Sequence, residues 1–138
     1  TAARPAVELT ELERRSVTTL SGGAAARVRF SRSAAQDATV ALLDEPTAAL
    51  DPHHREQVLE LARCWARAGK TVLVVLHDLS VAARYADRVV MLKGGRVVND
   101  GAPAEVFTAE TIRMVYGQEA HVLKHPDNGA PVVIPVGL

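Results

Sequence analysis

Residues 39–52 read Thr-Val-Ala-Leu-Leu-Asp-Glu-Pro-Thr-Ala-Ala-Leu-Asp-Pro, and this stretch decides the predicted fold. Its first five residues form a continuous apolar run, which is typical of a strand buried on both faces. Pro46 ends that strand. Asp51 followed by Pro52 is the arrangement that begins a helix, because aspartate caps the first turn and proline suits the first helical position. We therefore predict a strand over 39–43 and a helix from residue 52.

The same alternation of strand and helix continues downstream. The helix that starts at residue 52 has an apolar face and ends at Gly69, and a second apolar run over 71–76 predicts another buried strand. We also expect a helix over 81–86, a strand over 88–92 that turns through Gly94-Gly95 into a strand over 96–99, helices over 104–107 and 109–116, and a small edge strand or extended tail within 121–138. Strand, helix, strand, helix, strand in this order predicts an α/β fold on a parallel sheet.

The composition is that of an ordinary globular domain and excludes several classes of function. Sixteen Lys and Arg residues balance sixteen Asp and Glu residues, so no net charge favours nucleic acid or an anionic membrane. The single cysteine, Cys64, rules out an internal disulfide. No run approaches the roughly 18 apolar residues of a membrane span, and the first residues lack the apolar core of a signal peptide. We expect a cytosolic chain unless a partner carries it to a membrane.

Polar side chains follow both predicted core strands. Asp44 and Glu45 come directly after the first strand, and His77 and Asp78 follow the second. Ligands bind beyond the carboxyl ends of parallel strands, and neighbouring strand residues point in different directions. One carboxylate can therefore reach a Mg²⁺ ion while the next polarises a water molecule as a general base. The alternative is that both acids merely cap the strand at the solvent.

Serine and histidine residues supply further candidates, each with an ordinary structural alternative. Ser21-Gly22-Gly23 opens a predicted helix, and its hydroxyl and bare amides suit a terminal phosphate or, equally, a simple helix cap. His77 can donate to a phosphate oxygen or serve as a structural imidazole. His121 and His125 have the spacing of two ligands on one helix face, but no third ligand lies nearby, so we expect no metal there.

Taken together, these motifs resemble the ABC ATPase family in type, order and spacing. The resemblance rests on Leu20-Ser21-Gly22-Gly23, on Thr39–Leu43 followed by Asp44-Glu45-Pro46-Thr47, on Ala49-Leu50-Asp51, and on His77-Asp78. It implies an α/β fold that forms the C-terminal part of a P-loop NTPase, with a parallel sheet flanked by helices.

The resemblance also implies a role for each motif. Leu20, Ser21, Gly22 and Gly23 would form the signature loop, which binds the γ-phosphate of ATP held by the opposite subunit. Asp44 would hold Mg²⁺, and Glu45 would be the catalytic base. Asp51 would close the loop at the dimer interface, and His77 would be the switch histidine.

One family motif is absent from the 138 residues. No stretch matches the phosphate-binding loop G-x-x-x-x-G-K-[ST], and Ala24 replaces the usual Gln or Glu after the signature glycines. We therefore expect a partial domain over 1–138 with the Walker A half missing. Its parts would be the end of the helical subdomain over 1–36, the catalytic core over 37–101, and C-terminal helices and tail over 102–138. ATP and Mg²⁺ are expected only together with the missing half, and apolar surface should be exposed.

The C-terminal sequence narrows the resemblance to one kind of importer. Residues 95–108 and the His125-Pro126 tail look like ATPases of importers for iron chelates, haem and cobalamin, and residues 51–56 lean toward haem importers. The implied function is the energy-coupling subunit of such an importer, peripheral on the cytoplasmic face. Its implied partners are a second ATPase subunit in a homodimer, the transmembrane permease subunits and, indirectly, a substrate-binding protein, but no nucleic acid.

Two other functions remain open. The chain could instead be a non-catalytic interaction module derived from an ABC ATPase. It could also be a soluble ABC-type ATPase of repair or translation, against which the importer-like tail argues.

Overall fold

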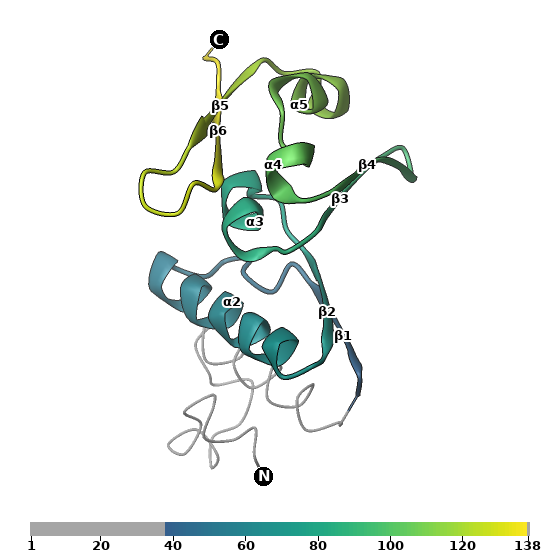
Figure 1. The fold of residues 1–138 in the computed structure, drawn as a ribbon, viewed down its shortest axis with the longest axis vertical. Coiled ribbons are helices and arrows are strands. Elements are labelled where there is room, and N and C mark those ends of the chain that lie inside the picture. Colours follow the sequence, from purple (N-terminus) through teal and green to yellow (C-terminus); the bar gives the residue numbers. More distant parts are fainter. Residues whose placement is uncertain (1–37, 138) are drawn as a thin grey trace. The chain divides into compact units, whose positions relative to one another are not determined.

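A computed structural model describes residues 38–137, which form two units that meet in the chain between Leu76 and His77 (Figure 1). The first unit contains β1 (Val40–Asp44), α2 (Pro52–Arg67) and β2 (Thr71–Val75). The second contains α3 (Leu79–Tyr85), β3 (Val89–Lys93), β4 (Arg96–Gly101), α4 (Pro103–Val106), α5 (Ala109–Tyr116), β5 (Ala120–Lys124) and β6 (Pro131–Pro135).

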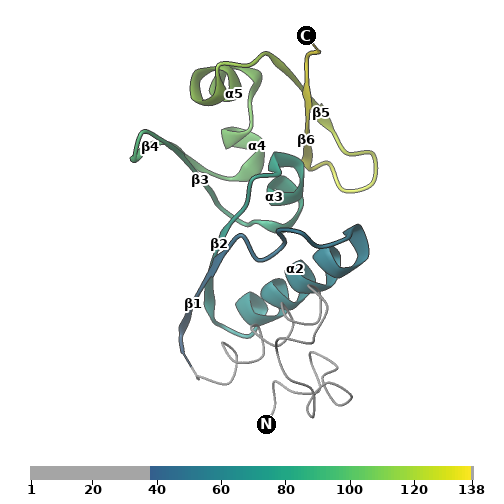
Figure 2. The ribbon, with the colours of Figure 1, turned by 180° about the vertical axis from the view of Figure 1, so that it is seen from behind.

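In the first unit, β1 and β2 run parallel and α2 crosses between them (Figures 1 and 2). The register pairs Val40 with Thr71 and Asp44 with Val75, so the carboxyl ends of the two strands lie side by side. Leu43, Val58, Ala62 and Trp65 form a buried cluster between the strands and one face of α2. The predicted strands, their parallel pairing and the start of the helix after Asp51 are confirmed.

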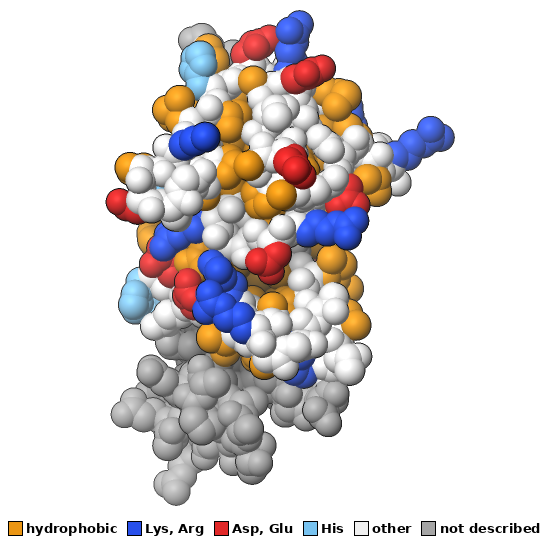
Figure 3. Space-filling view, in the orientation of Figure 1, with side chains coloured by type: hydrophobic (Ala, Val, Ile, Leu, Met, Phe, Trp, Pro, Cys, Tyr) orange, Lys and Arg blue, Asp and Glu red, His pale blue; other side chains and the backbone are white. Residues whose placement is uncertain are grey.

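The prediction that β1 is buried on both faces is wrong for the described residues. Leu43 is 7% exposed on the inner face, whereas Val40 and Leu42 on the outer face are 59% and 67% exposed. The outer face of β2 is similar, with Leu73 and Val75 exposed. Alternation explains the difference, since only every second side chain meets α2. The expected exposed apolar surface is therefore present, and apolar side chains also lie between the charged ones in Figure 3.

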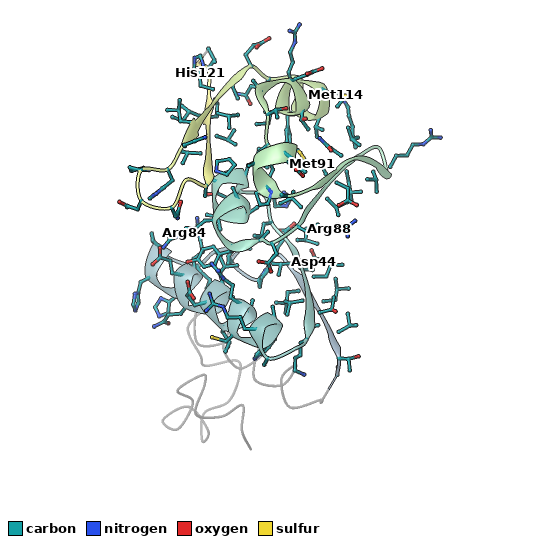
Figure 4. All side chains as sticks on the ribbon, in the orientation of Figure 1. Asp44, Arg84, Arg88, Met91, Met114 and His121 are labelled. Carbon is teal, nitrogen blue, oxygen red and sulfur yellow. The ribbon has the colours of Figure 1, made fainter. Side chains whose placement is uncertain are left out.

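In the second unit, two antiparallel hairpins and three short helices enclose a separate core. Ala83, Met91, Val106 and Phe107 are its buried residues, and Figure 4 shows Met91 inside this unit. Figure 3 shows basic side chains projecting from the β3–β4 hairpin, whose turn lies between Lys93 and Arg96. The predicted hairpin through Gly94-Gly95 is confirmed, since this turn brings β3 and β4 together as an antiparallel pair. We also expected the strand at 88–92 to continue the parallel sheet, but among the described residues β3 pairs with β4 alone.

The C-terminal segment differs most from the prediction. Residues 121–138 were expected to hold a single edge strand or an extended tail, and they instead form the β5–β6 hairpin. His121 lies in β5 and His125 comes directly after that strand, so the two histidines do not share a helix face. The predicted subdomain boundaries at residues 36 and 101 stay predictions.

Among the described residues, no helix combines the length and the hydropathy needed to cross a membrane.

Candidate functional site

The loop between β1 and α2 carries three of the predicted site residues, Asp44, Glu45 and Asp51. Asp44 is the last residue of β1, and Figure 4 labels it at that end of the strand. The amide of Glu45 donates to the carbonyl of Val75 at 3.1 Å, which extends the strand pairing by one residue. Both carboxylates therefore lie at the carboxyl end of the parallel pair, as predicted, and both are exposed.

The backbone at Glu45 turns sharply into the left-handed region, with a φ of 46°. This conformation costs roughly 1–2 kcal/mol for a residue that has a Cβ. The carbonyl of Glu45 accepts from the amide of Ala48 at 3.1 Å, and Ala49 also has a positive φ of 59°. Strain of this kind clusters at functional sites, because the surrounding structure must hold it in place. The backbone therefore leaves the strand conformation at Glu45, directly after Asp44.

Two anchors hold the far end of this loop. Leu50 is buried, packs with Leu43 and Trp65, and so fixes the loop to the core of the first unit. Asp51 caps α2: its carboxylate accepts from the amide of His54 at 3.0 Å and contacts the His54 ring nitrogen at 2.5 Å. The hydrogen bond from the His54 amide, followed by the bond from its ring, lowers the pKa of Asp51 below the ordinary value. Asp51 is therefore a charged cap on a rigid loop.

The chemistry of the Asp44–Glu45 end fits Mg²⁺ and a water nucleophile. Magnesium in phosphate sites takes only one or two carboxylates and keeps several waters, so a single exposed strand-end aspartate is sufficient. Among residues 38–137, His, Cys, Asp and Glu side chains nowhere gather in threes in a way that would hold a metal ion. The Asp44 carboxylate therefore fits a phosphate-bound Mg²⁺.

His77 begins the second unit, two residues after the end of β2. It is exposed, and the next residue, Asp78, caps α3 by accepting from the amide of Val81 at 3.0 Å. The prediction began this helix at residue 81 and is wrong by two residues, since it overlooked Asp78 as a cap. An aspartate that follows an apolar strand and precedes a helix is the signal that would have placed it.

His77 and Asp78 also line an open cleft of about 290 Å³ within the second unit. Ser80, Tyr116 and Gln118 contribute further polar groups to its walls, and none of these three was predicted as a site residue. No sequence motif singles them out, because they come from separate elements that only the fold brings together.

The remaining candidates, Leu20, Ser21, Gly22 and Gly23, lie outside the described residues. The structure therefore brings Asp44, Glu45 and Asp51 together on one loop of the first unit and places His77 at the start of the second. That His77 and residues 20–23 come together with the two carboxylates is therefore a proposal.

Comparison with known proteins gives a consistent result. A family profile described as ABC transporter matches residues 1–48, which include the Leu20–Gly23 motif and both carboxylates. The hemin import ATP-binding protein HmuV of Nocardia farcinica is 53% identical over 135 residues, covering 98% of this chain and 47% of that protein. HmuV of Thermobifida fusca is 48% identical, covering 97% of this chain and 47% of that protein. The chain thus spans about half the length of the curated relatives it matches.

Solved structures show the same fold. A metal-chelate type ABC transporter in an inward-facing conformation superposes with a TM-score of 0.86 at 24% identity, over 99% of this chain and 55% of that one. The cbiO1 protein of Clostridium perfringens, part of the ABC transporter complex cbiONQ, gives a TM-score of 0.69 at 28% identity over 84% of this chain and 48% of that one.

Proposed function

We propose that this chain, whose sequence and fold are those of part of an ABC-transporter ATPase domain, belongs to the ATP-hydrolysing subunit of an importer for haemin or another iron chelate. The names of the curated relatives support haemin as the cargo. The subunit would work as a homodimer on transmembrane permease subunits, at the cytoplasmic face of the membrane, and would meet a substrate-binding protein only indirectly.

The observation that carries this proposal is the pair of carboxylates at the carboxyl end of β1. Asp44 continues the strand, whereas Glu45 turns away at a φ of 46°. Two adjacent acids that point in different directions can divide two tasks, one toward a metal-bound phosphate and one toward a water molecule. A pair of acids that only capped the strand would need no strained backbone.

In the proposed reaction, Glu45 accepts a proton from water. The water oxygen bonds to the γ-phosphorus of ATP, and the bond from that phosphorus to the bridging oxygen breaks and leaves ADP with the electron pair. Mg²⁺ at Asp44 would supply positive charge to the phosphate oxygens. His77 would donate a hydrogen bond to the γ-phosphate, and Leu20, Ser21, Gly22 and Gly23 of the second subunit would cover it.

Asp51 would set the geometry of the loop at the dimer interface. Asp51 caps α2 with a charged carboxylate, and it ends the loop that begins at Glu45. It therefore links the position of Glu45, the proposed base, to the start of α2. Buried Leu50 keeps the intervening loop from shifting.

The test is Glu45→Gln in the full-length subunit assembled with its permease. Turnover of ATP should fall by about 100-fold or more, the usual size of a general-base contribution, while nucleotide binding is retained. Glu60→Gln is the matched control, since Glu60 is an exposed acid on α2, and it should hydrolyse ATP normally. Normal hydrolysis by the Glu45→Gln variant would remove Glu45 as the base.

A second candidate function is a non-catalytic interaction module. The exposed apolar faces of β1 and β2 favour a chain that binds another protein surface. In that case the Glu45→Gln and wild-type subunits would bind partners alike, and neither would hydrolyse ATP.

A further inference from the structure

The outer edge of β6 bonds to α3 at Val133. Along an antiparallel hairpin, opposite residue pairs that exchange hydrogen bonds alternate with pairs that do not. Val133 faces Val122 across the hairpin, yet its amide donates to the Oγ of Ser80 in α3, at 3.0 Å, so its N–H points out of the hairpin. Pro131 and Pro135 occupy the two equivalent positions on either side and have no N–H. Within β6, Val133 therefore carries the one main-chain donor on this edge, and Ser80 accepts it.

Ser80 belongs to the segment that carries the predicted switch histidine. It is the second residue of α3, three residues after His77 and two after the Asp78 cap. Leu79, between them, packs against the core of the second unit, as does Val133 itself. The start of α3 is thus held by the Asp78 carboxylate, by an apolar contact and by the Ser80 hydroxyl.

The cleft in the second unit explains why the Ser80 hydrogen bond affects the position of the start of α3. His77, Asp78 and Ser80 form one wall of this space of about 290 Å³, and Val133 and Pro135 of β6 form another. The hydrogen bond between Ser80 and Val133 joins these two walls. Without this hydrogen bond, the start of α3 could shift into the open space of the cleft.

We infer that Ser80 is a positioning residue: by accepting the Val133 amide, it fixes the start of α3 against the C-terminal hairpin and so holds the backbone from which His77 acts. The inference rests on the proposed role of His77 in ATP hydrolysis. It assigns to the β5–β6 hairpin a part in the reaction, although the hairpin contributes no side chain to the proposed chemistry.

The test compares three variants of the full-length subunit in its permease complex by the kcat and the KM for ATP. Ser80→Ala should lower kcat on the order of two- to tenfold, the worth of one hydrogen bond, and should change KM by less than about twofold. Ser80→Thr keeps the hydroxyl and should restore kcat. Ile134→Ala is the control, because Ile134 lies next to Val133 in β6 but is exposed and does not line the cleft, and it should keep kcat.

Two further variants separate this inference from the proposed function. His77→Ala should lower turnover strongly, and Ser80→Ala added to it should lower turnover no further, because residues that act as one unit are not additive. A His77→Ala subunit with normal turnover would refute the proposed role of His77, and the role of Ser80 with it.

Other results would overturn the inference while leaving the proposed function intact. One is a Ser80→Ala subunit that loses thermal stability but keeps its kcat, which is the result of a purely structural role. Another is a double variant slower than His77→Ala alone, which would mean that Ser80 acts independently of His77.

Discussion

The β1–β2 pair and the β5–β6 hairpin both expose apolar side chains, but they differ in strand direction and in how their edges are closed. Leu42 and Leu73 lie directly opposite each other on the outer face of β1–β2, and both are more than half exposed. Parallel strands in proteins are covered on both faces, whereas an antiparallel pair can face water on one side. The edge of β6 is also closed, because Pro131 and Pro135 remove donors and Ser80 takes the one that is left. The comparison indicates that the parallel β1–β2 pair requires a cover on its outer face, whereas the antiparallel β5–β6 hairpin can leave one face in water.

The largest expected effect tests whether the two regions depend on separate cores. Trp65 is 8% exposed in the core of the first unit. Trp65→Ala in the full-length subunit should cost about 3–5 kcal/mol, since it leaves a large cavity. Hydrogen exchange should then show loss of protection in β1, α2 and β2, while β5–β6 stays protected. Cys64→Ala, at the exposed neighbouring position, is the control. Equal loss of protection in both regions would mean that the two cores unfold as one.

The next prediction tests whether the outer face of β1–β2 is covered. The curated relatives are about twice as long as this chain, so those proteins have further residues available to pack on the corresponding face. Leu42→Asp in the full-length subunit should cost about 2–4 kcal/mol, as a charge placed in an apolar contact does. Leu123→Asp, at a similarly exposed position in β5, should cost less than about 0.5 kcal/mol. Denaturant unfolding measures both, and equal costs would contradict the comparison.

The first unit could be predicted from sequence, and the reasons are physical. The apolar runs over 39–43 and 71–76 have the length and composition of strands, and the Asp51-Pro52 step both caps and starts α2. In the second unit, α5 ends at residue 116 as predicted, directly before Gly117, whose φ is 68°. These signals are local, and the tertiary contacts of these segments agree with the local preferences.

The hairpin at the C-terminus could not be predicted in the same way. β5 reads Ala-His-Val-Leu-Lys, which lacks a clear alternation, and its partner β6 bonds to α3, a helix distant in the chain. The positive φ of Glu45 could not be predicted either, because a glutamate does not favour this conformation and the bond from its amide to the Val75 carbonyl joins residues far apart in the chain. Sequence motifs therefore identified Asp44, Glu45, Asp51 and His77 as candidates, but not Ser80, whose partner is 53 residues away.

A smaller effect concerns the charged cap that starts α2 in the first unit. His54 lowers the pKa of Asp51 in the folded protein below its ordinary value of 3.8. The ionised carboxylate therefore contributes stability that is fully present above the unfolded pKa and is lost as the pH falls through the folded pKa. Asp51→Asn keeps a good cap but removes the charge. It should be less stable than the parent at pH 7, and the difference should shrink as the pH falls below 3.8 and through the lower folded pKa, as thermal unfolding would measure; a difference that stays constant over this range would contradict the linkage.

The smallest effect on stability comes from opening the edge of β6. Pro135 is exposed, so Pro135→Thr should change the free energy of unfolding by less than about 0.5 kcal/mol. The substitution nevertheless places a new N–H on the edge that Pro131 and Pro135 now close, and exposed strand edges pair with other chains. Sedimentation of the full-length subunit should therefore show association that rises with concentration. Val136→Thr is the control, because the Val136 amide already donates to the carbonyl of Glu119 at 2.9 Å and the change exposes no new donor. If both variants sediment like the parent, the prolines do not protect this edge, and the contrast with β1–β2 then rests on the covered face alone.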